Sequence, residues 1–191
     1  MLTDAEIRAL GDDGVFVRDH FLGQELAAMM ALTVEEFCRH NVRPAGMGPT
    51  AHLDRTQRGD EIAWVNDVPE FAPLVARFQS LRHDLNESAY LGLDRIDIQV
   101  ARYPGDGAAY TRHRDALQGD PRGRRVTTIY YTNRSYEPAH GGVLRLHLSE
   151  ITRDIEPLLD RLVVFLSERV WHEVLPTFAP RHAVTAWFYA R

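Results

Sequence analysis

A short stretch near the middle of the chain combines two side chains that often bind metals. His113-Arg114-Asp115 places an imidazole and a carboxylate two positions apart, and on a β-strand residues i and i+2 lie on the same face. A later histidine, either His147 or His172, would complete a set of two histidines and one carboxylate. Such a set leaves coordination positions open and is typical of non-haem iron(II), which uses them for a cosubstrate and for oxygen.

The His-x-Asp spacing is weak evidence by itself. The chain holds nine histidines, and a second match, His52-Leu53-Asp54, lies in a stretch rich in proline, glycine and polar residues. Neither side of that second match shows the alternation of a strand. We therefore give weight to the residues that surround 113–115 rather than to the spacing alone.

These surroundings resemble the metal site of the EGL-nine type prolyl hydroxylases, which are iron- and 2-oxoglutarate-dependent enzymes. The likeness begins with Tyr-Pro-Gly at 103–105, runs through 113–115, and returns downstream in His172-Glu173-Val174-Leu175-Pro176. Further matches lie in the same order at 58–64, 125–131, 141–146, 154–162 and 181–188. The resemblance therefore covers roughly residues 58–189.

The resemblance implies a double-stranded β-helix, or jelly roll, with a metal site inside it. His113, Asp115 and His172 match the iron ligands, and His147 is then left as a surface residue of a strand. The implied activity is that of a dioxygenase that uses iron(II), 2-oxoglutarate and O2, with ascorbate as a possible reductant, and releases succinate and CO2.

The same resemblance implies a pocket for the cosubstrate. Arg181 matches the residue that pairs with the distal carboxylate of 2-oxoglutarate, and a bidentate arginine–carboxylate pair is a strong interaction. The Tyr131 hydroxyl matches a second donor to that carboxylate. Further lining positions are matched by Tyr103, Ile129, Leu144 and Thr185.

The resemblance also implies a substrate: a prolyl residue of a protein, hydroxylated at C4. The positions that match the substrate side are Arg58, Asp60, Arg124 and Trp187. The loop 41–60 has the glycine, proline and arginine content of a lid, although an ordinary surface connection has the same composition. The bacterial relatives indicate a translation factor, such as elongation factor Tu, as the protein substrate.

The elements that must position these residues can be read from periodicity. Helices are expected over 24–40 and 69–87, and Thr3 with Glu6 predicts a capping box for a short first helix. From residue 95 the period changes to that of short strands separated by turns. These strands are expected at 96–101, 126–131, 143–148, 162–166 and 182–189, and one earlier strand is expected at 15–17.

We therefore predict a mainly β protein with supporting helices (α+β), formed as one domain over 1–191. Residues 1–90 are expected to supply helical support and the substrate loop, and residues 91–191 the jelly-roll core. The chain ends at Arg191, soon after the last expected strand. We accordingly expect neither the additional C-terminal helix of the animal enzymes nor a zinc-finger module.

Composition limits the classes of function. All 22 basic residues are arginine, so lysine-based chemistry is excluded. A net charge of −5 argues against nucleic acid or a membrane surface as partner. A single cysteine, Cys38, excludes an internal disulfide framework. With no signal peptide and no long apolar run, we expect a cytoplasmic protein.

Two other functions share this sequence pattern. The first is an oxygenase of the same core that acts on a free amino acid or another small molecule, for which we expect a narrow, closed pocket. An open groove flanked by Arg58 and Trp187 would favour a protein substrate instead. The second is a jelly roll that binds metal without catalysis.

Overall fold

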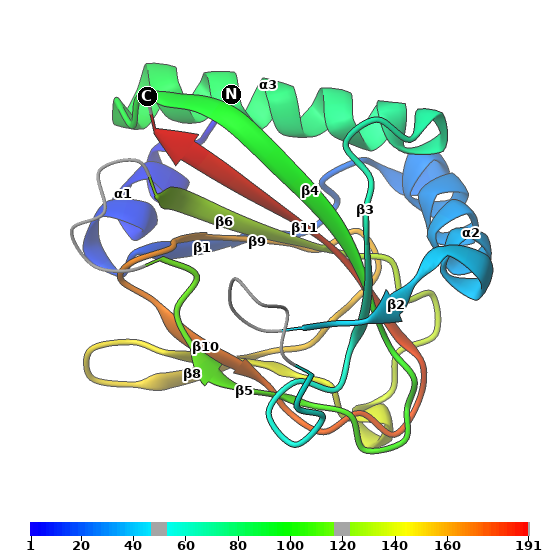
Figure 1. Cartoon of the computed structure of the whole chain (residues 1–191). Coiled ribbons are helices and arrows are strands. Elements are labelled where there is room, and N and C mark those ends of the chain that lie inside the picture. Colours follow the sequence, from blue (N-terminus) through cyan, green and yellow to red (C-terminus); the bar gives the residue numbers. More distant parts are fainter. Residues whose placement is uncertain (47–52, 117–122, 191) are drawn as a thin grey trace.

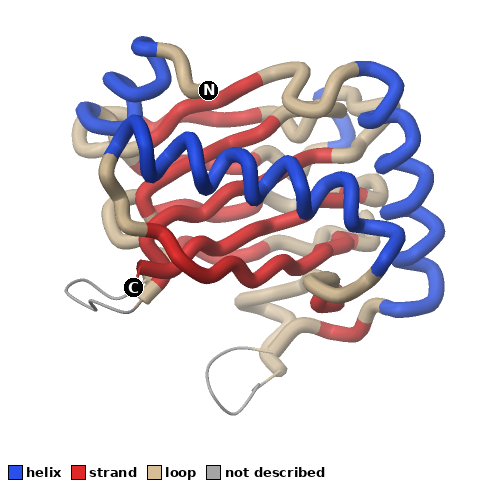
Figure 2. The backbone as a smooth tube through the Cα atoms, turned by 90° about the horizontal axis from the view of Figure 1, so that it is seen from above, coloured by secondary structure: helices blue, strands red, loops and turns tan. Residues whose placement is uncertain are grey.

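Two antiparallel β-sheets face one another, and helices cover the outer side of the larger sheet (Figure 1). The computed structural model describes residues 1–46, 53–116 and 123–190. Figure 2 shows the longest helical rod crossing the strands of the larger sheet. This arrangement confirms the predicted jelly roll with supporting helices.

Three α-helices form the outer layer. Helix α1 (Asp4–Asp12) begins with the predicted capping box of Thr3 and Glu6. Helices α2 (Gln24–Asn41) and α3 (Ala72–Ala89) confirm the two longer predictions, and a 3-10 turn, η1 (Pro69–Phe71), precedes α3. The apolar positions of α3 recur at helical spacing, so Leu74, Phe78, Leu81 and Leu85 all point to the sheet and are buried.

The larger sheet has seven strands, in the order β1-β9-β6-β11-β4-β3-β2. Its central strands are β6 (Arg124–Tyr131), β11 (Arg181–Ala190) and β4 (Leu93–Tyr103). The first 90 residues supply three of its strands. The outer strands are β1 (Val15–Arg18), β9 (Leu162–Leu166), β3 (Glu61–Trp64) and β2 (Arg43–Pro44).

The smaller sheet has four strands, in the order β5-β10-β7-β8. They are β5 (Tyr110–His113), β10 (Trp171–Val174), β7 (Leu144–His147) and β8 (Thr152–Ile155). A short 3-10 turn, η2 (Pro138–His140), leads into β7.

The hydrophobic core has two parts, one on each side of the larger sheet. The first lies between that sheet and the helices and includes Phe78, Val184 and Phe188. The second lies between the two sheets and includes Leu144 and Phe165. Because side chains alternate along a strand, β11 sends Val184, Ala186 and Phe188 to the helices, and Arg181, Ala183, Thr185 and Trp187 to the space between the sheets.

The expected strands at 15–17, 96–101, 126–131, 143–148, 162–166 and 182–189 correspond to β1, β4, β6, β7, β9 and β11. Alternation did not predict β2, β3, β5, β8 or β10, each of which has four residues or fewer. Residues 47–52 of the loop 41–60 lie outside the described residues, so its expected role as a lid stays a prediction. No helix of the described chain is long and apolar enough to cross a membrane.

Candidate active site

Three potential metal ligands meet between the sheets. His113 ends β5, Asp115 follows two residues later, and His172 lies on β10 directly opposite His113. The Nε2 atom of His113 lies 3.7 Å from Asp115 Oδ1, and that of His172 lies 3.8 Å from Asp115 Oδ2. One ligand atom from each residue falls within 4.8 Å of the other two, so one ion could contact all three.

Hydrogen bonds orient these side chains. Nδ1 of His113 lies 2.8 Å from the carbonyl of Thr111, which favours a proton on Nδ1 and leaves Nε2 with a free lone pair. Asp115 Oδ2 accepts a hydrogen bond from Thr127 Oγ1 at 2.8 Å and one from Trp187 Nε1 at 3.0 Å. The carboxylate is therefore held by donors behind it, as the second shell of a metal site requires.

The protonation states also suit a metal. Burial lowers the pKa of His113 to about 4, and the neighbouring His172 adds to that effect while Asp115 opposes it. Burial alone would raise the pKa of Asp115, but His172, His113 and Arg124 outweigh it and the pKa is lowered. A neutral imidazole and an ionised carboxylate are the forms that bind a cation. Two nitrogens and one carboxylate at these positions fit iron(II).

The other histidines considered from the sequence lie elsewhere. His147 points to the outer face of the smaller sheet, where its Nε2 lies 2.8 Å from Glu173 Oε1. His52 lies outside the described residues, and Asp54, its neighbour in the second His-x-Asp, accepts hydrogen bonds from Thr56 and Gln57 in its own turn. Among the described residues, His113, Asp115 and His172 form the one candidate metal group.

A cavity of about 640 Å³ extends from these ligands into the space between the sheets. Arg181 lies on its wall with its side chain buried. Its Nε donates a hydrogen bond to the Gly142 carbonyl at 2.8 Å, and no carboxylate of a described residue pairs with it. Because a buried guanidinium without an anion is costly, the cavity fits a ligand that brings a carboxylate. The predicted lining residues Tyr103, Ile129, Leu144 and Thr185 are all on this wall.

Glycine is required beside Arg181. Gly142 has a φ of +68°, and a Cβ there would lie 2.8 Å from the Cδ of Arg181. A side chain at this position would be strained and would displace the arginine. The Gly141-Gly142 pair thus positions the guanidinium as well as turning the chain.

Tyr131 lies beside Arg181 rather than on the cavity wall. The guanidinium carbon of Arg181 is 5.1 Å from the centroid of the Tyr131 ring. Burial raises the pKa of Tyr131, and the charge and donors of Arg181 offset part of that rise. The hydroxyl is buried without a well-formed hydrogen bond to any described residue, so it remains available to a ligand carboxylate.

The predicted substrate residues line the same cavity. Arg58 and Asp60 form an ion pair at 2.8 Å, and the guanidinium of Arg124 lies 4.1 Å from the centroid of the Trp187 indole. Gly59 lets this loop approach closely, because a Cβ there would lie 2.9 Å from the Cβ of Ala108.

Three residues of the site, Trp64, Tyr110 and Thr127, were not predicted from the sequence. Trp64 is 53% exposed, and the centroids of the Trp64 and Trp187 rings are 5.7 Å apart. The ring of Tyr110 stacks on that of His113 with 3.8 Å between their centroids. Thr127, the donor to Asp115, shares a strand face with Ile129 and Tyr131, so parity along β6 could have found it. Nothing local in the sequence marked Trp64, since the contact with Trp187 joins distant segments.

Comparison with known proteins agrees with this geometry. Residues 98–189 match the family described as the 2OG-Fe(II) oxygenase superfamily. The human prolyl hydroxylase EGLN3 is 33% identical over 196 aligned positions, which cover 96% of this chain and 81% of that protein. The chain belongs to the prolyl hydroxylase family of 2OG-Fe(II) oxygenases.

Solved structures of this oxygenase family extend the likeness to the whole described fold. A prolyl-4-hydroxylase from Pseudomonas putida is 34% identical, with a TM-score of 0.87 and coverage of 98% of both chains. A prolyl hydroxylase from Trichoplax adhaerens, solved with a peptide of hypoxia-inducible factor, is 30% identical with a TM-score of 0.88, covering 96% of this chain and 87% of that one. The prediction of a 2-oxoglutarate-dependent dioxygenase is confirmed, and iron(II) and 2-oxoglutarate are its cofactor and cosubstrate.

Proposed function

We propose that this oxygenase hydroxylates a prolyl residue of a protein, at C4, and releases succinate and CO2. In this proposal His113, Asp115 and His172 hold the iron(II). The bound metal, with 2-oxoglutarate and O2, supplies the oxidising chemistry. The residues of the chain position the ligands, exclude water and bring the proline to the metal.

Other residues of the site bind the cosubstrate or hold a metal ligand in place. Arg181 pairs with the distal carboxylate of 2-oxoglutarate, and the Tyr131 hydroxyl donates to the same group. Trp187 and Thr127 hold the Asp115 carboxylate through their hydrogen bonds. Four side chains enclose the carbon chain of the cosubstrate: Tyr103, Ile129, Leu144 and Thr185.

The open mouth of the cavity is the observation that favours a protein substrate. The cavity continues from buried Arg181 to Trp64, which is more than half exposed, so it reaches the surface. Arg58, with its partner Asp60, and Trp187, with Arg124 above it, flank this opening. A polypeptide can lie across such an opening, whereas a free amino acid would need contacts that enclose it.

The identity of the protein substrate is a narrower proposal. The relatives are described as prolyl hydroxylases, and the sequence resemblance to bacterial members favours elongation factor Tu. A cytoplasmic location, where translation takes place, belongs to the same proposal.

Mass spectrometry of protein substrates tests the proposal. Purified enzyme with iron(II), 2-oxoglutarate and heavy-isotope O2 is incubated with purified elongation factor Tu and, separately, with a cell lysate. We expect one heavy oxygen atom on a proline, with one succinate formed for each modified residue. His172→Ala, which removes a proposed ligand, is the matched negative control.

Two outcomes would contradict the proposal. Succinate formation driven by free proline or another small molecule, with no modified protein, would establish the small-molecule oxygenase. No succinate under any condition, with iron still bound, would establish a metal-binding jelly roll without catalysis.

A further inference from the structure

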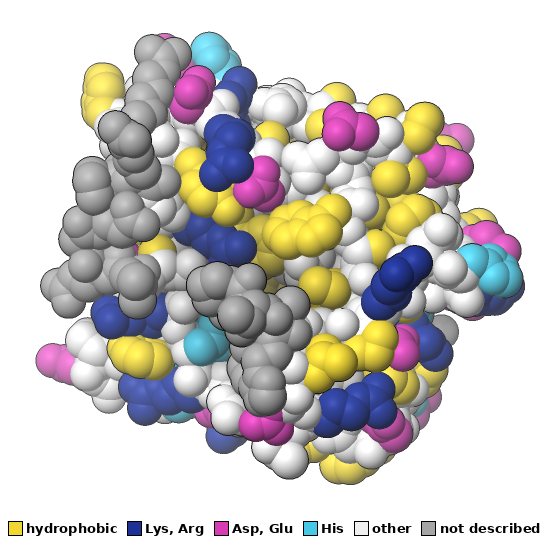
Figure 3. Space-filling view, viewed as in Figure 1, with side chains coloured by type: hydrophobic (Ala, Val, Ile, Leu, Met, Phe, Trp, Pro, Cys, Tyr) yellow, Lys and Arg dark blue, Asp and Glu magenta, His cyan; other side chains and the backbone are white. Residues whose placement is uncertain are grey.

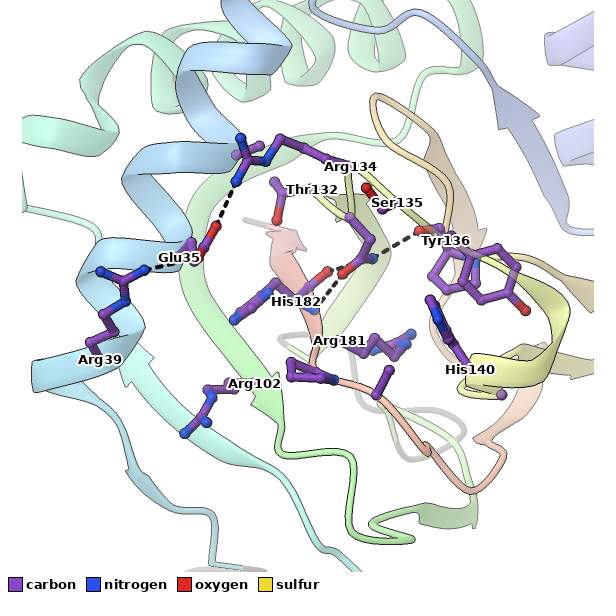
Figure 4. Close-up of a pocket in the computed structure, with 16 residues that line it drawn as sticks. Glu35, Arg39, Arg102, Thr132, Arg134, Ser135, Tyr136, His140, Arg181 and His182 are labelled. Carbon is purple, nitrogen blue, oxygen red and sulfur yellow. Dashed lines mark hydrogen bonds and ion pairs between the residues drawn. The ribbon is translucent and has the colours of Figure 1, made fainter.

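A second cavity lies behind the proposed cosubstrate pocket. It has a volume of about 530 Å³ and is bounded by helix α2, the start of β11 and the segment 132–141. Figure 4 shows Glu35, Arg39, Arg102 and His182 around one part of it, and Tyr136, His140 and Arg181 around the other. None of the roles proposed above uses this cavity.

The charge of the wall is mainly positive. Four arginines line the cavity, Arg39, Arg102, Arg134 and Arg181, against one acid, Glu35. Arg39 and Arg134 each contact Glu35 at 2.9 Å, and Arg39 also pairs with Glu36 at 2.7 Å. Arg102 pairs at 2.8 Å with Glu61, which is not on the wall. Of the four arginines, Arg181 is the one without a carboxylate partner among the described residues, so its charge is available to an anion.

Buried polar atoms on the wall lack partners. Thr132 is 4% exposed, and its Oγ1 makes no hydrogen bond to the described residues; the buried hydroxyl of Tyr136 is in the same situation. The imidazole of His182 is half-buried, and the contacts of His182 with Asn133 use its backbone. Buried polar groups normally have partners, so the hydroxyls of Thr132 and Tyr136 point to a polar ligand or ordered solvent in the cavity.

The electrostatic potential inside the cavity is positive, as the arginines of its wall lead one to expect. Burial lowers the pKa of His182 to about 4, and the positive charges of Arg102 and Arg181 lower it further against the effect of Glu35. His182 is therefore uncharged at neutral pH, so one ring nitrogen donates a hydrogen bond and the other accepts one. The same positive potential would attract an anion.

Arg181 joins the two cavities. It lies on the wall of both. The next residue, His182, is clamped through its backbone N–H and carbonyl by the side chain of Asn133, which neighbours Thr132, at 2.7 and 3.1 Å. A ligand that contacts Thr132 or His182 would therefore act on the segment that carries Arg181.

We propose that this second cavity binds a small metabolite through a carboxylate or phosphate group, and that its occupancy weakens the binding of 2-oxoglutarate. Both oxyanions suit the forked donors of arginine. Two anions on either side of Arg181 would share its one positive charge and repel each other. By linkage, each ligand must then weaken the other by the same factor.

Calorimetric titration of the full-length protein tests the site directly. Citrate and inorganic phosphate are the probes, so the two arms distinguish a carboxylate from a phosphate ligand. Arg102→Gln and Thr132→Val change side chains that line the second cavity and not the first. Arg8→Gln makes the same change of charge at an exposed position of α1 and is the matched control.

We expect saturable binding of at least one probe. Arg102→Gln should weaken it by about tenfold, as the loss of one charge-assisted contact does, and Thr132→Val by less, whereas Arg8→Gln should leave it unchanged. Absence of saturable binding for both probes would overturn the proposal. An equal loss in Arg8→Gln would also overturn it, because binding would then reflect net charge rather than this cavity.

The coupling is measured by titrating 2-oxoglutarate into manganese-loaded protein at increasing concentrations of the probe that binds. This part rests on the proposed cosubstrate site. We expect the affinity for 2-oxoglutarate to fall by about fivefold or more at saturation, and the probe concentration that gives half of this effect to rise by about tenfold in Arg102→Gln. An unchanged or increased affinity would overturn the coupling. If 2-oxoglutarate does not bind at all, the proposed function fails, while the binding of the probe still decides the second cavity.

Discussion

The two faces of the larger sheet carry different kinds of side chain on the same strands. Toward the helices, β11 places Val184, Ala186 and Phe188, which are fully buried among apolar neighbours (Figure 1). Toward the smaller sheet it places Arg181 and Trp187, which face the cavity and the candidate metal ligands. Adjacent residues of one strand therefore belong to different environments.

The face toward the helices therefore contributes to stability, and the face toward the smaller sheet carries the residues of the candidate site. Around Val184, Ala186 and Phe188 the face toward the helices is closely packed with apolar side chains, so it can hold the strands in register without contributing to the site. The face toward the smaller sheet lines a cavity, and Arg181 on that face has no carboxylate partner among the described residues. Figure 3 shows the consequence at the surface, where basic and apolar side chains gather side by side on the face of the molecule that Figure 1 presents. Neighbouring residues on opposite faces thus form natural pairs for mutagenesis.

The largest difference is expected between two histidine substitutions on opposite faces of the smaller sheet. His172→Ala removes a proposed ligand from the inner face, so bound iron and succinate formation should fall to background. His147→Ala removes an imidazole from the outer face, where it contacts Glu173, and should change stability by less than about 1 kcal/mol. Metal analysis and a succinate assay measure both. Iron retained in His172→Ala at the wild-type level would contradict the assignment.

The next effect compares neighbours on β11. Phe188→Ala empties a fully buried position against the helices and should lower the free energy of unfolding by about 3–5 kcal/mol. Trp187→Phe keeps most of the volume but removes the donor to Asp115, so it should reduce turnover more than stability. Urea denaturation and initial rates measure the two. Equal losses of stability would show that the faces are not separable.

A smaller effect is expected within the cavity. Arg181→Gln removes the proposed partner of the distal carboxylate, and the loss of a charge-assisted pair, on the order of 1.5–3 kcal/mol, should raise the KM for 2-oxoglutarate by about 10- to 150-fold. Arg181→Lys keeps the positive charge but lacks the paired donors of the guanidinium, so its KM for 2-oxoglutarate should lie between those of the wild type and Arg181→Gln. Succinate formation against 2-oxoglutarate concentration measures this. A KM unchanged in Arg181→Gln would place the carboxylate elsewhere.

The smallest effect compares neighbouring threonines of β6. Thr127 Oγ1 donates to Asp115, whereas Thr128 Oγ1, on the opposite face, donates to the Ala186 carbonyl. Thr127→Val should weaken metal binding by about tenfold, as the loss of a second-shell hydrogen bond does. Thr128→Val should cost about 1 kcal/mol of stability and leave metal affinity unchanged. Metal titrations and denaturation curves of both variants check this, and a reversed pattern would contradict it.

Local sequence was sufficient for much of the fold. The helices follow from apolar residues at helical spacing and from the Thr3–Glu6 capping box, which act within a few residues. The longer strands follow from alternation. Strands β2, β3, β5, β8 and β10 were not predicted because two to four residues are too few to show alternation, and β3, β5 and β10 pair with strands distant in the chain. Their positions depend on the sheet and not on their own composition.

The sequence by itself determined which chemistry is available. His-x-Asp with a later histidine, in an ordered setting of matches, was enough to identify the family, and the lack of lysine left arginine to meet the carboxylate. Tertiary structure alone decided that His113 and His172 lie opposite one another, that Trp64 meets Trp187 at the mouth, and that Arg181 has a cavity on each side. These relations join residues far apart in the chain, and only the packing of two sheets brings them within contact distance.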